Sequence, residues 1–270
     1  MNTTATPYCG RPSRGRAQAL LIIGLIACVM APRSQASSIV APNANQNVDG
    51  DANNVAPFSA GLFGTGPSER YQQVYAASQF AAAGSTFDIG AIAFRLDAND
   101  APGFESDTYP SIQIDLSTTA FGPNQLSSTF SNNIGADDRV AYNGSLTLSG
   151  AGGQNPNPFN LIVNLQTPFL YTPSQGNLLL DIRVNQAGTG FLAALDATNG
   201  SDFTSRVRSF NDVNALTGTA DTLGLVTQFS TPQGTPEPSA LLLCACGMAL
   251  LGLHRLSRRA LRSRDSDGAF

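Results

Sequence analysis

The chain contains no tryptophan, no lysine and only one histidine, His254, which lies near its C-terminus. The four cysteines also lie near the two ends, at Cys9, Cys28, Cys244 and Cys246. A Ser-His-Asp or Cys-His catalytic arrangement therefore cannot be built in the long middle region, and His/Cys zinc sites are excluded there too. Disulfides cannot hold that region, so it must be stable by packing alone. We expect a protein that is not an enzyme and has no cofactor.

Negative charge dominates the middle of the chain. Residues 37–235 carry six arginines against sixteen acidic residues, a balance of −10, whereas the whole chain has a formal net charge of −4. Such a region repels nucleic acid and anionic lipid headgroups, so we expect no nucleic-acid partner. It could attract divalent cations or basic surfaces, although solubility is the simpler interpretation of the charge.

Long apolar runs are confined to the two ends. The C-terminal run, Ala240–Leu253, follows Pro236-Glu237-Pro238 and precedes an arginine cluster. The members of that cluster are Arg255, Arg258, Arg259, Arg262 and Arg264. Fourteen helical residues span roughly 21 Å against a bilayer core of about 30 Å, so the run predicts a short transmembrane helix at 239–254. The basic tail, 255–264, should stay cytoplasmic. A buried core helix is the alternative.

The N-terminal run has the order of a secretory signal. Three arginines precede the apolar residues 19–30, and Ser34-Gln35-Ala36 follows them. This pattern predicts a signal peptide, 1–36, that is cut between Ala36 and Ser37. A retained anchor helix is the alternative. In either case the general secretion machinery would export the middle of the chain.

Together, Pro236-Glu237-Pro238, the apolar span and the arginine cluster resemble the PEP-CTERM sorting signal of exported proteins from Gram-negative bacteria. The resemblance covers residues 233–270. It implies that an exosortase, a membrane-embedded protease or transpeptidase, processes the chain near the Pro-Glu-Pro triplet. Cys244 and Cys246 inside the apolar run, and the tail that continues to Phe270, depart from the pattern without breaking it.

Short stretches of alternating hydrophobicity recur through the middle of the chain. They are clearest at Ser111–Ser117, 159–166 and 178–184, with a further one late in the domain at 223–229. Weaker candidates are 91–96, 139–142, 145–149, 190–195 and 205–210, and Asn143-Gly144 is a candidate turn. Period two is typical of half-buried strands. We expect eight to ten strands in an all-β fold, an antiparallel β-sandwich with the jelly roll as one form of it, over residues 57–232. A flexible lead-in is expected at 37–56.

A softer resemblance concerns this β-rich region itself. Phrases such as Arg70–Tyr75, Ile92–Arg95, Asp115–Thr119 and Gly176–Ile182 look like a domain found in one group of PEP-CTERM proteins. The resemblance implies a β-rich extracellular domain and brings no catalytic residues with it. Arg70–Phe80 fits either a short helix or a strand, and the alternation of Tyr71, Gln73 and Tyr75 favours the strand.

Several polar groups are candidates for metal-binding or catalytic sites. Asp49, Asp51 and Asn53 place oxygens at alternate positions, but the EF-hand pattern is not completed, which favours a polar loop. Asp137 and Asp138 are weak candidates for calcium. Glu69 and Glu105 are the only glutamates of the exported region, and nothing selects them as a catalytic pair. Tyrosines are expected in the core, and arginines beside strands, namely Arg70, Arg95 and Arg183, are expected to pair with aspartates.

These observations favour a non-enzymatic exported protein that is anchored briefly in the membrane and sorted to the cell surface or the extracellular matrix of a biofilm. Its role there would be structural or adhesive. The alternative is a carbohydrate-binding module for extracellular polysaccharide, assisted by calcium. A carboxylate hydrolase is the weakest of the three hypotheses.

Overall fold

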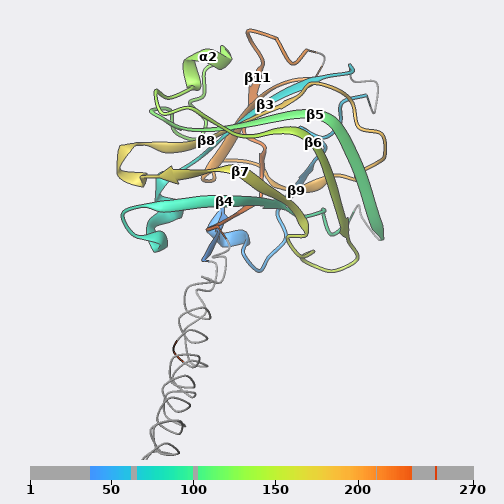
Figure 1. Ribbon diagram of the computed structural model, residues 1–270, viewed down its shortest axis with the longest axis horizontal. Coiled ribbons are helices and arrows are strands. Elements are labelled where there is room, and N and C mark those ends of the chain that lie inside the picture. The colour runs from blue at the N-terminus through green and yellow to red at the C-terminus, as the bar shows by residue number, and fades with distance from the viewer. Residues whose placement is uncertain (1–36, 62–65, 100–102, 211, 233–246, 248–270) are drawn as a thin grey trace, which may run out of the picture. The chain divides into compact units, whose positions relative to one another are not determined.

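Antiparallel strands make up most of the regular structure (Figure 1). The computed structural model describes residues 37–61, 66–99, 103–210, 212–232 and 247. The strands of this part are β1 (Ser38–Ala41), β2 (Ala52–Asn54), β3 (Glu69–Tyr75), β4 (Phe87–Phe94), β5 (Phe104–Thr119), β6 (Arg139–Ala151), β7 (Leu161–Tyr171), β8 (Asn177–Val184), β9 (Leu195–Thr198), β10 (Thr204–Ser209), β11 (Thr219–Asp221), β12 (Gly224–Leu225) and β13 (Thr227–Ser230). Short helical turns are η1 (Asn43–Asn45), η2 (Ala77–Ala83), α2 (Phe130–Asn133) and η3 (Pro173–Gln175).

The strands form three sheets. One has the order β1-β13-β4-β7, the largest has the order β11-β10-β3-β8-β5-β6, and a small one has the order β12-β9-β2. Each pairing is antiparallel. The prediction of an all-β, antiparallel fold is therefore confirmed. The described body falls within one compact unit, Ala36–Gln233.

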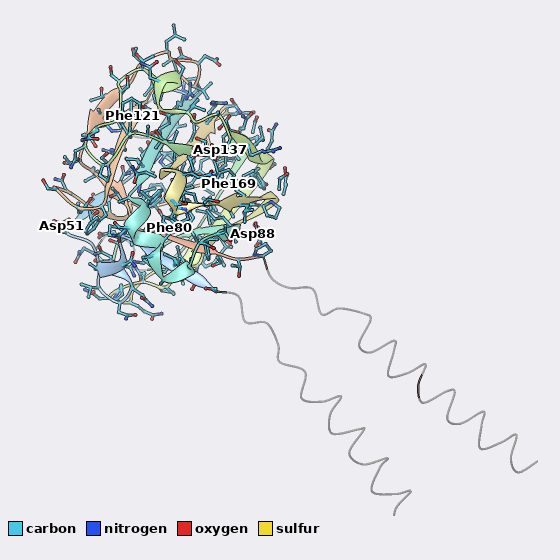
Figure 2. The ribbon with its side chains drawn as sticks, turned by 90° about the vertical axis from the view of Figure 1, so that its left-hand side faces the viewer. Asp51, Phe80, Asp88, Phe121, Asp137 and Phe169 are labelled. Atoms are coloured by element: carbon cyan, nitrogen blue, oxygen red, sulfur yellow. The ribbon has the colours of Figure 1, made fainter. Side chains whose placement is uncertain are left out.

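Aromatic side chains fill the space between the sheets. Phe80 packs edge-on against Tyr171, with ring centroids 4.9 Å apart, and lies 5.4 Å from Phe229. Phe58 packs edge-on against Phe94, and its ring is tilted against that of Tyr109. The side chain of Phe80, which is labelled in Figure 2, is fully buried. Such aromatic pairs stabilise the fold beyond the hydrophobic effect of burial. Packing of this kind supplies stability to a region that has no cysteines for disulfides.

A second, smaller cluster covers the outer face of the large sheet. Leu179 packs there with Val74, Phe130 and Val207. Phe130 belongs to α2, so the segment between β5 and β6 shields this part of the sheet from water. This explains why β8 is buried on both faces, whereas its alternating sequence predicted one buried face only.

Polar residues beside this cluster form a bonded network. Asp181 accepts hydrogen bonds from Arg70 at 2.7 Å and from Gln72 at 2.8 Å. Arg183 lies 3.0 Å from a carboxylate oxygen of Asp115 and 3.2 Å from Asp181. The prediction that Arg70, Arg95 and Arg183 pair with aspartates is confirmed, and the third pair is described below.

Two expectations about local structure were wrong. Residues 37–56 are not a flexible lead-in, because β1 pairs with β13 and β2 pairs with β9, and Ile39 and Ala41 join the core. Asn143-Gly144 is not a turn, because β6 runs straight through it. Gly144 has a φ of 150° and lies opposite an irregularity between Tyr109 and Ile112 of β5, which absorbs the unusual backbone without ending the strand.

Candidate functional site

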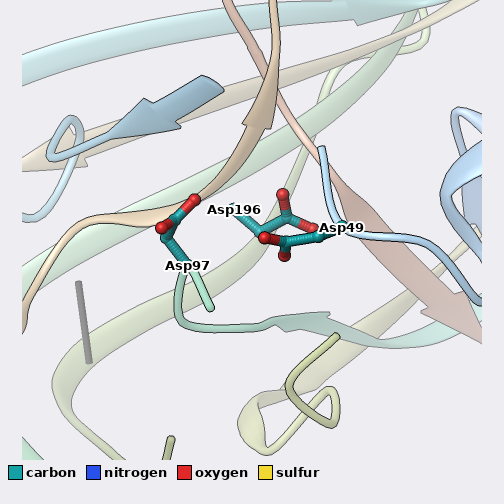
Figure 3. Close-up of side chains that lie close together, drawn as sticks. All are labelled: Asp49, Asp97 and Asp196. Carbon is teal, nitrogen blue, oxygen red and sulfur yellow. The ribbon is translucent and has the colours of Figure 1, made fainter. Parts of the chain in front are cut away.

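Three aspartates from distant parts of the chain lie close together (Figure 3). Asp49 follows η1, Asp97 follows β4, and Asp196 lies in β9. One carboxylate oxygen of each lies within 4.8 Å of the other two. Asp97 and Asp196 are 3% and 1% exposed, and Asp49 is partly exposed. Within the residues that the structure describes, this is the only group of three acidic side chains at metal-ligand spacing.

Backbone contacts with β9 hold the three residues together. The backbone N–H of Asp97 donates to the carbonyl of Ala194 at 3.0 Å, and that of Asp196 donates to the carbonyl of Arg95 at 3.0 Å. Gly50 donates its N–H to the Asp196 carboxylate at 2.7 Å. A Cβ at position 50 would lie 1.9 Å from the carbonyl oxygen of Ala197, so only glycine permits this approach.

Arg95 supplies the positive charge of the site. Its side chain is 1% exposed, and Nε donates to Oδ2 of Asp196 at 2.5 Å. Its Nη2 donates to the carbonyls of Asn45 and Val48 at 2.9 and 2.7 Å, and its guanidinium lies over the ring of Phe159. Arg95 therefore ties the loop after η1 to β9 and neutralises one carboxylate of the three.

The hydrogen bonds to the three carboxylates do not offset all of their negative charge. Burial raises the pKa of Asp196 to about 6, against the lowering effect of Arg95. Burial, and then the nearby charge of Asp97, raise the pKa of Asp49. Oδ1 of Asp49 is shielded from solvent and accepts no hydrogen bond from a described residue. The charges of Asp97 and Asp196 thus repel that of Asp49, and protonation of Asp49 or Asp196 relieves that repulsion.

Oxygen donors of this kind suit calcium, which takes six to eight oxygen ligands. The loop Asp49–Asn53, interpreted from the sequence as a polar loop, does not gather its own oxygens around one point. Asp51 instead accepts a hydrogen bond from the N–H of Asn199 at 2.8 Å. Sequence reasoning missed Asp97 and Asp196, because only the fold brings them to Asp49.

The weak candidates Asp137 and Asp138 lie elsewhere, in the segment before β6. Asp137 accepts hydrogen bonds from the N–H and the hydroxyl of Thr118, at 2.8 and 2.7 Å, and so fastens its loop to β5. Asp138 lies at the surface, where partial burial and then the charges of Asp115 and Asp181 raise its pKa to about 6. Neither belongs to a three-ligand acidic group among the described residues.

The two glutamates have separate structural partners. Glu69 is fully buried, burial raises its pKa to about 7, and its Oε2 accepts a hydrogen bond from the hydroxyl of Ser59 at 3.0 Å. The carboxylate of Glu105 accepts the backbone N–H of Ala193. These contacts hold the Ser59 loop and the Ala193 segment in place.

The residues predicted to direct sorting lie outside the described part. These are Ala36, Pro236, Glu237, Pro238, Arg255, Arg258, Arg259, Arg262 and Arg264. Ser37, the other side of the expected cleavage site, is described and lies at the edge of the first sheet. Among the residues that the structure describes, no helix has the length and apolar character needed to cross a membrane.

Comparisons with protein-family models, curated proteins and solved structures each found no significant match to this chain.

Proposed function

We propose that this chain is an exported, non-enzymatic protein that an exosortase processes near Pro236–Ser239. The secretion machinery would carry it across the inner membrane, and the C-terminal helix would hold it there until processing. The β domain, for which we propose a β-sandwich of the jelly-roll kind, would then serve a structural or adhesive role at the cell surface or in the extracellular matrix.

The observation that carries this proposal is the pairing of the first strand with the last. Ser38 of β1 lies opposite Ser230 of β13, and the backbone N–H of Thr231 donates to the carbonyl of Ser37 at 2.9 Å. Ser37 is the first residue after the expected signal-peptide cut. The two ends of the described domain therefore lie side by side. Such a domain could fold while either predicted membrane segment, or both, remained in the same membrane.

The spacing on the C-terminal side also fits this role. Pro236 lies five residues beyond Thr231. Five extended residues reach at most about 17 Å, so the proposed cut would occur close to the folded domain. Little of the linker would then remain on the mature protein, and β13 would be its last structural element.

The proposal is tested by the mass of the mature protein. The intact chain is expressed in cells with and without an exosortase, and each product is weighed by mass spectrometry. With the exosortase, we expect a product that begins at Ser37 and lacks residues 239–270. Without it, the C-terminal residues should remain.

Two variants sharpen this test. Glu237→Ala should block processing because it removes the only charge of the triplet, whereas Gln233→Ala, outside the triplet, should be processed normally. A mature protein that keeps residues 239–270 in the presence of the exosortase would contradict the sorting role.

A second candidate is the binding of extracellular polysaccharide, which an open cavity beside Arg208 favours. Glycan binding is measured with and without calcium, because the group of Asp49, Asp97 and Asp196 offers oxygen ligands. If no glycan binds under either condition, the purely structural role stands.

A further inference from the structure

A cavity opens to solvent where β10 meets the segment that leads into β11. Its volume is about 390 Å³, within the range of small-molecule sites. Its lining consists of Arg208, Ser209, Phe210, Thr217, Gly218 and Thr219. Apart from Arg208, no charged side chain among the described residues lines it. The cavity thus combines one cation, one aromatic ring and three hydroxyl groups.

Arg208 is held in place but only weakly paired. Its guanidinium lies 4.1 Å from the ring centroid of Phe210. Its Nη2 lies 3.3 Å from Oδ2 of Asp221. Its Nε is shielded from solvent and has no hydrogen-bond partner among the described residues. A guanidinium has five N–H donors. Because Nε is shielded from solvent and Nη2 already contacts Asp221, the donors of Arg208 that remain for a ligand are on the two terminal nitrogens.

The carboxylate of Asp221 is largely committed to another arginine. Arg206 donates from Nε to Oδ1 of Asp221 at 2.7 Å and from Nη2 to Oδ2 at 3.1 Å. Its third contact is with the side-chain oxygen of Asn54. Asp221 therefore compensates Arg206 first, and Arg208 is left with a single longer ion pair.

The other carboxyl group near Arg208 is only partly charged at neutral pH. Burial raises the pKa of Glu69 to about 7, so this carboxyl is only partly ionised at neutral pH. Burial, and then the neighbouring charge of Arg206, lower the pKa of Arg208. Two arginines thus share Asp221 and a glutamate whose raised pKa reduces its charge at neutral pH, which leaves a local excess of positive charge in a strongly acidic domain.

We propose that this cavity binds the carboxylate of a sugar acid, such as a uronate unit of an anionic polysaccharide. A planar guanidinium pairs with a carboxylate through two parallel hydrogen bonds. The hydroxyls of Ser209, Thr217 and Thr219 can exchange hydrogen bonds with sugar hydroxyls. This inference deepens the proposed function, because it names the matrix component that the surface domain would hold.

Gly218 lets the segment that leads into β11 pack closely against β10. A Cβ at this position would lie 2.7 Å from the carbonyl oxygen of Arg208 and 2.7 Å from the ring of Phe130. A larger residue would therefore push the segment away from β10, and the hydroxyls of Thr217 and Thr219 would move with it.

Binding is tested on the full-length chain in detergent, so the result does not depend on processing by an exosortase. The probes are a trisaccharide of galacturonic acid, the neutral trisaccharide maltotriose and inorganic phosphate, each titrated by calorimetry at pH 6.5 and low salt. We expect the acidic trisaccharide to bind at least tenfold more tightly than either of the other probes.

Arg208→Gln should weaken that binding at least tenfold, while Arg139→Gln, on the exposed start of β6, should leave it unchanged. Thr219→Val keeps the charge of Arg208 and should weaken binding more modestly, which covers the case in which Arg208→Gln does not fold. The proposal is overturned by no binding of the acidic trisaccharide, by equal binding of maltotriose or phosphate, or by a folded Arg208→Gln variant that binds as the wild type does.

Discussion

The backbone N–H of Thr231 donates to the carbonyl of Ser37 at 2.9 Å, and the N–H of Ser37 donates back to the Thr231 hydroxyl at 3.0 Å. Residues 194 positions apart thus close the first sheet at its edge. The two ends of the domain are fixed to each other. We expect the N-terminal end to follow a cleaved signal peptide and the C-terminal end to precede the sorting signal.

We expect Thr231→Pro to loosen this closure, because proline has no N–H to give to Ser37. Thr231→Val keeps the N–H and removes only the hydroxyl, which makes it the matched control. The loss of one backbone hydrogen bond should cost about 1 kcal/mol. Hydrogen exchange at the amides of Ile39 and Ala41 should accelerate in the proline variant and much less in the valine variant. Equal acceleration of exchange in both variants would show that the closure depends on the hydroxyl.

Strands with their own alternating pattern were predictable from sequence. β3, β8 and β10 lie close to the stretches 70–80, 178–184 and 205–210 that the alternation indicated. Ser111–Ser117 likewise lies inside β5, although the strand continues well beyond it. In β5 and β8 apolar residues at every second position face the core, and that signal is local.

Strands that depend on distant partners were not predictable. β1 and β2 have four and three residues, too few to show a period, and they exist because β13 and β9 offer free edges to them. The stretch 190–195 was expected as a strand, but the described strand there is β9, which begins at Leu195. The partner strand, rather than local propensity, determines such boundaries.

The aspartate group illustrates the same limit for a site. A search along the sequence finds oxygens at Asp49 and Asp51 because they are neighbours, and the fold then separates them: Asp49 faces Asp196, and Asp51 faces Asn199. Arg95 organises the group. The sequence predicted that Arg95 pairs with an aspartate, but it could not identify which aspartate.

Arg95→Met should destabilise the domain strongly. The methionine fills part of the space, but Asp196 is then buried without its partner, and breaking one side of a buried ion pair costs about 3–5 kcal/mol. Arg139→Met, at an exposed position, is the control and should change little. Urea unfolding at pH 7 measures both. A loss below about 1 kcal/mol for Arg95→Met would mean that the Asp196 carboxyl is protonated in the wild type.

Asp97→Asn should stabilise the domain at pH 8 in the presence of EDTA. The charge of Asp97 raises the pKa of Asp49, so its removal relieves repulsion. Asparagine keeps an oxygen for the N–H of Asn99, which donates to Asp97 at 2.9 Å. We expect the Tm to rise by about 2–4 °C, which corresponds to roughly 1 kcal/mol. An unchanged or lower Tm of the variant in EDTA would contradict this repulsion, and a lower Tm only when calcium is present would show that the group binds calcium.

Glu69→Gln should remove a pH dependence of stability. Burial raises the pKa of Glu69 from its ordinary value of 4.5 to about 7, so the folded state holds this proton more tightly than the unfolded state does. The resulting stabilisation is complete below pH 4.5 and is lost as the pH rises through 7. A shift of this size corresponds to about 3 kcal/mol. Glutamine does not titrate and can still accept the hydrogen bond from Ser59.

The measurement is urea unfolding of wild type, Glu69→Gln and the exposed control Asp88→Asn at pH 5 and pH 8. Relative to wild type, Glu69→Gln should gain stability between pH 5 and pH 8, by up to about 3 kcal/mol, while Asp88→Asn should show no comparable change. If the gain is absent, Glu69 is already ionised in the folded protein at pH 5. Its charge would then compensate Arg208, and the positive excess at the cavity would be lost with it.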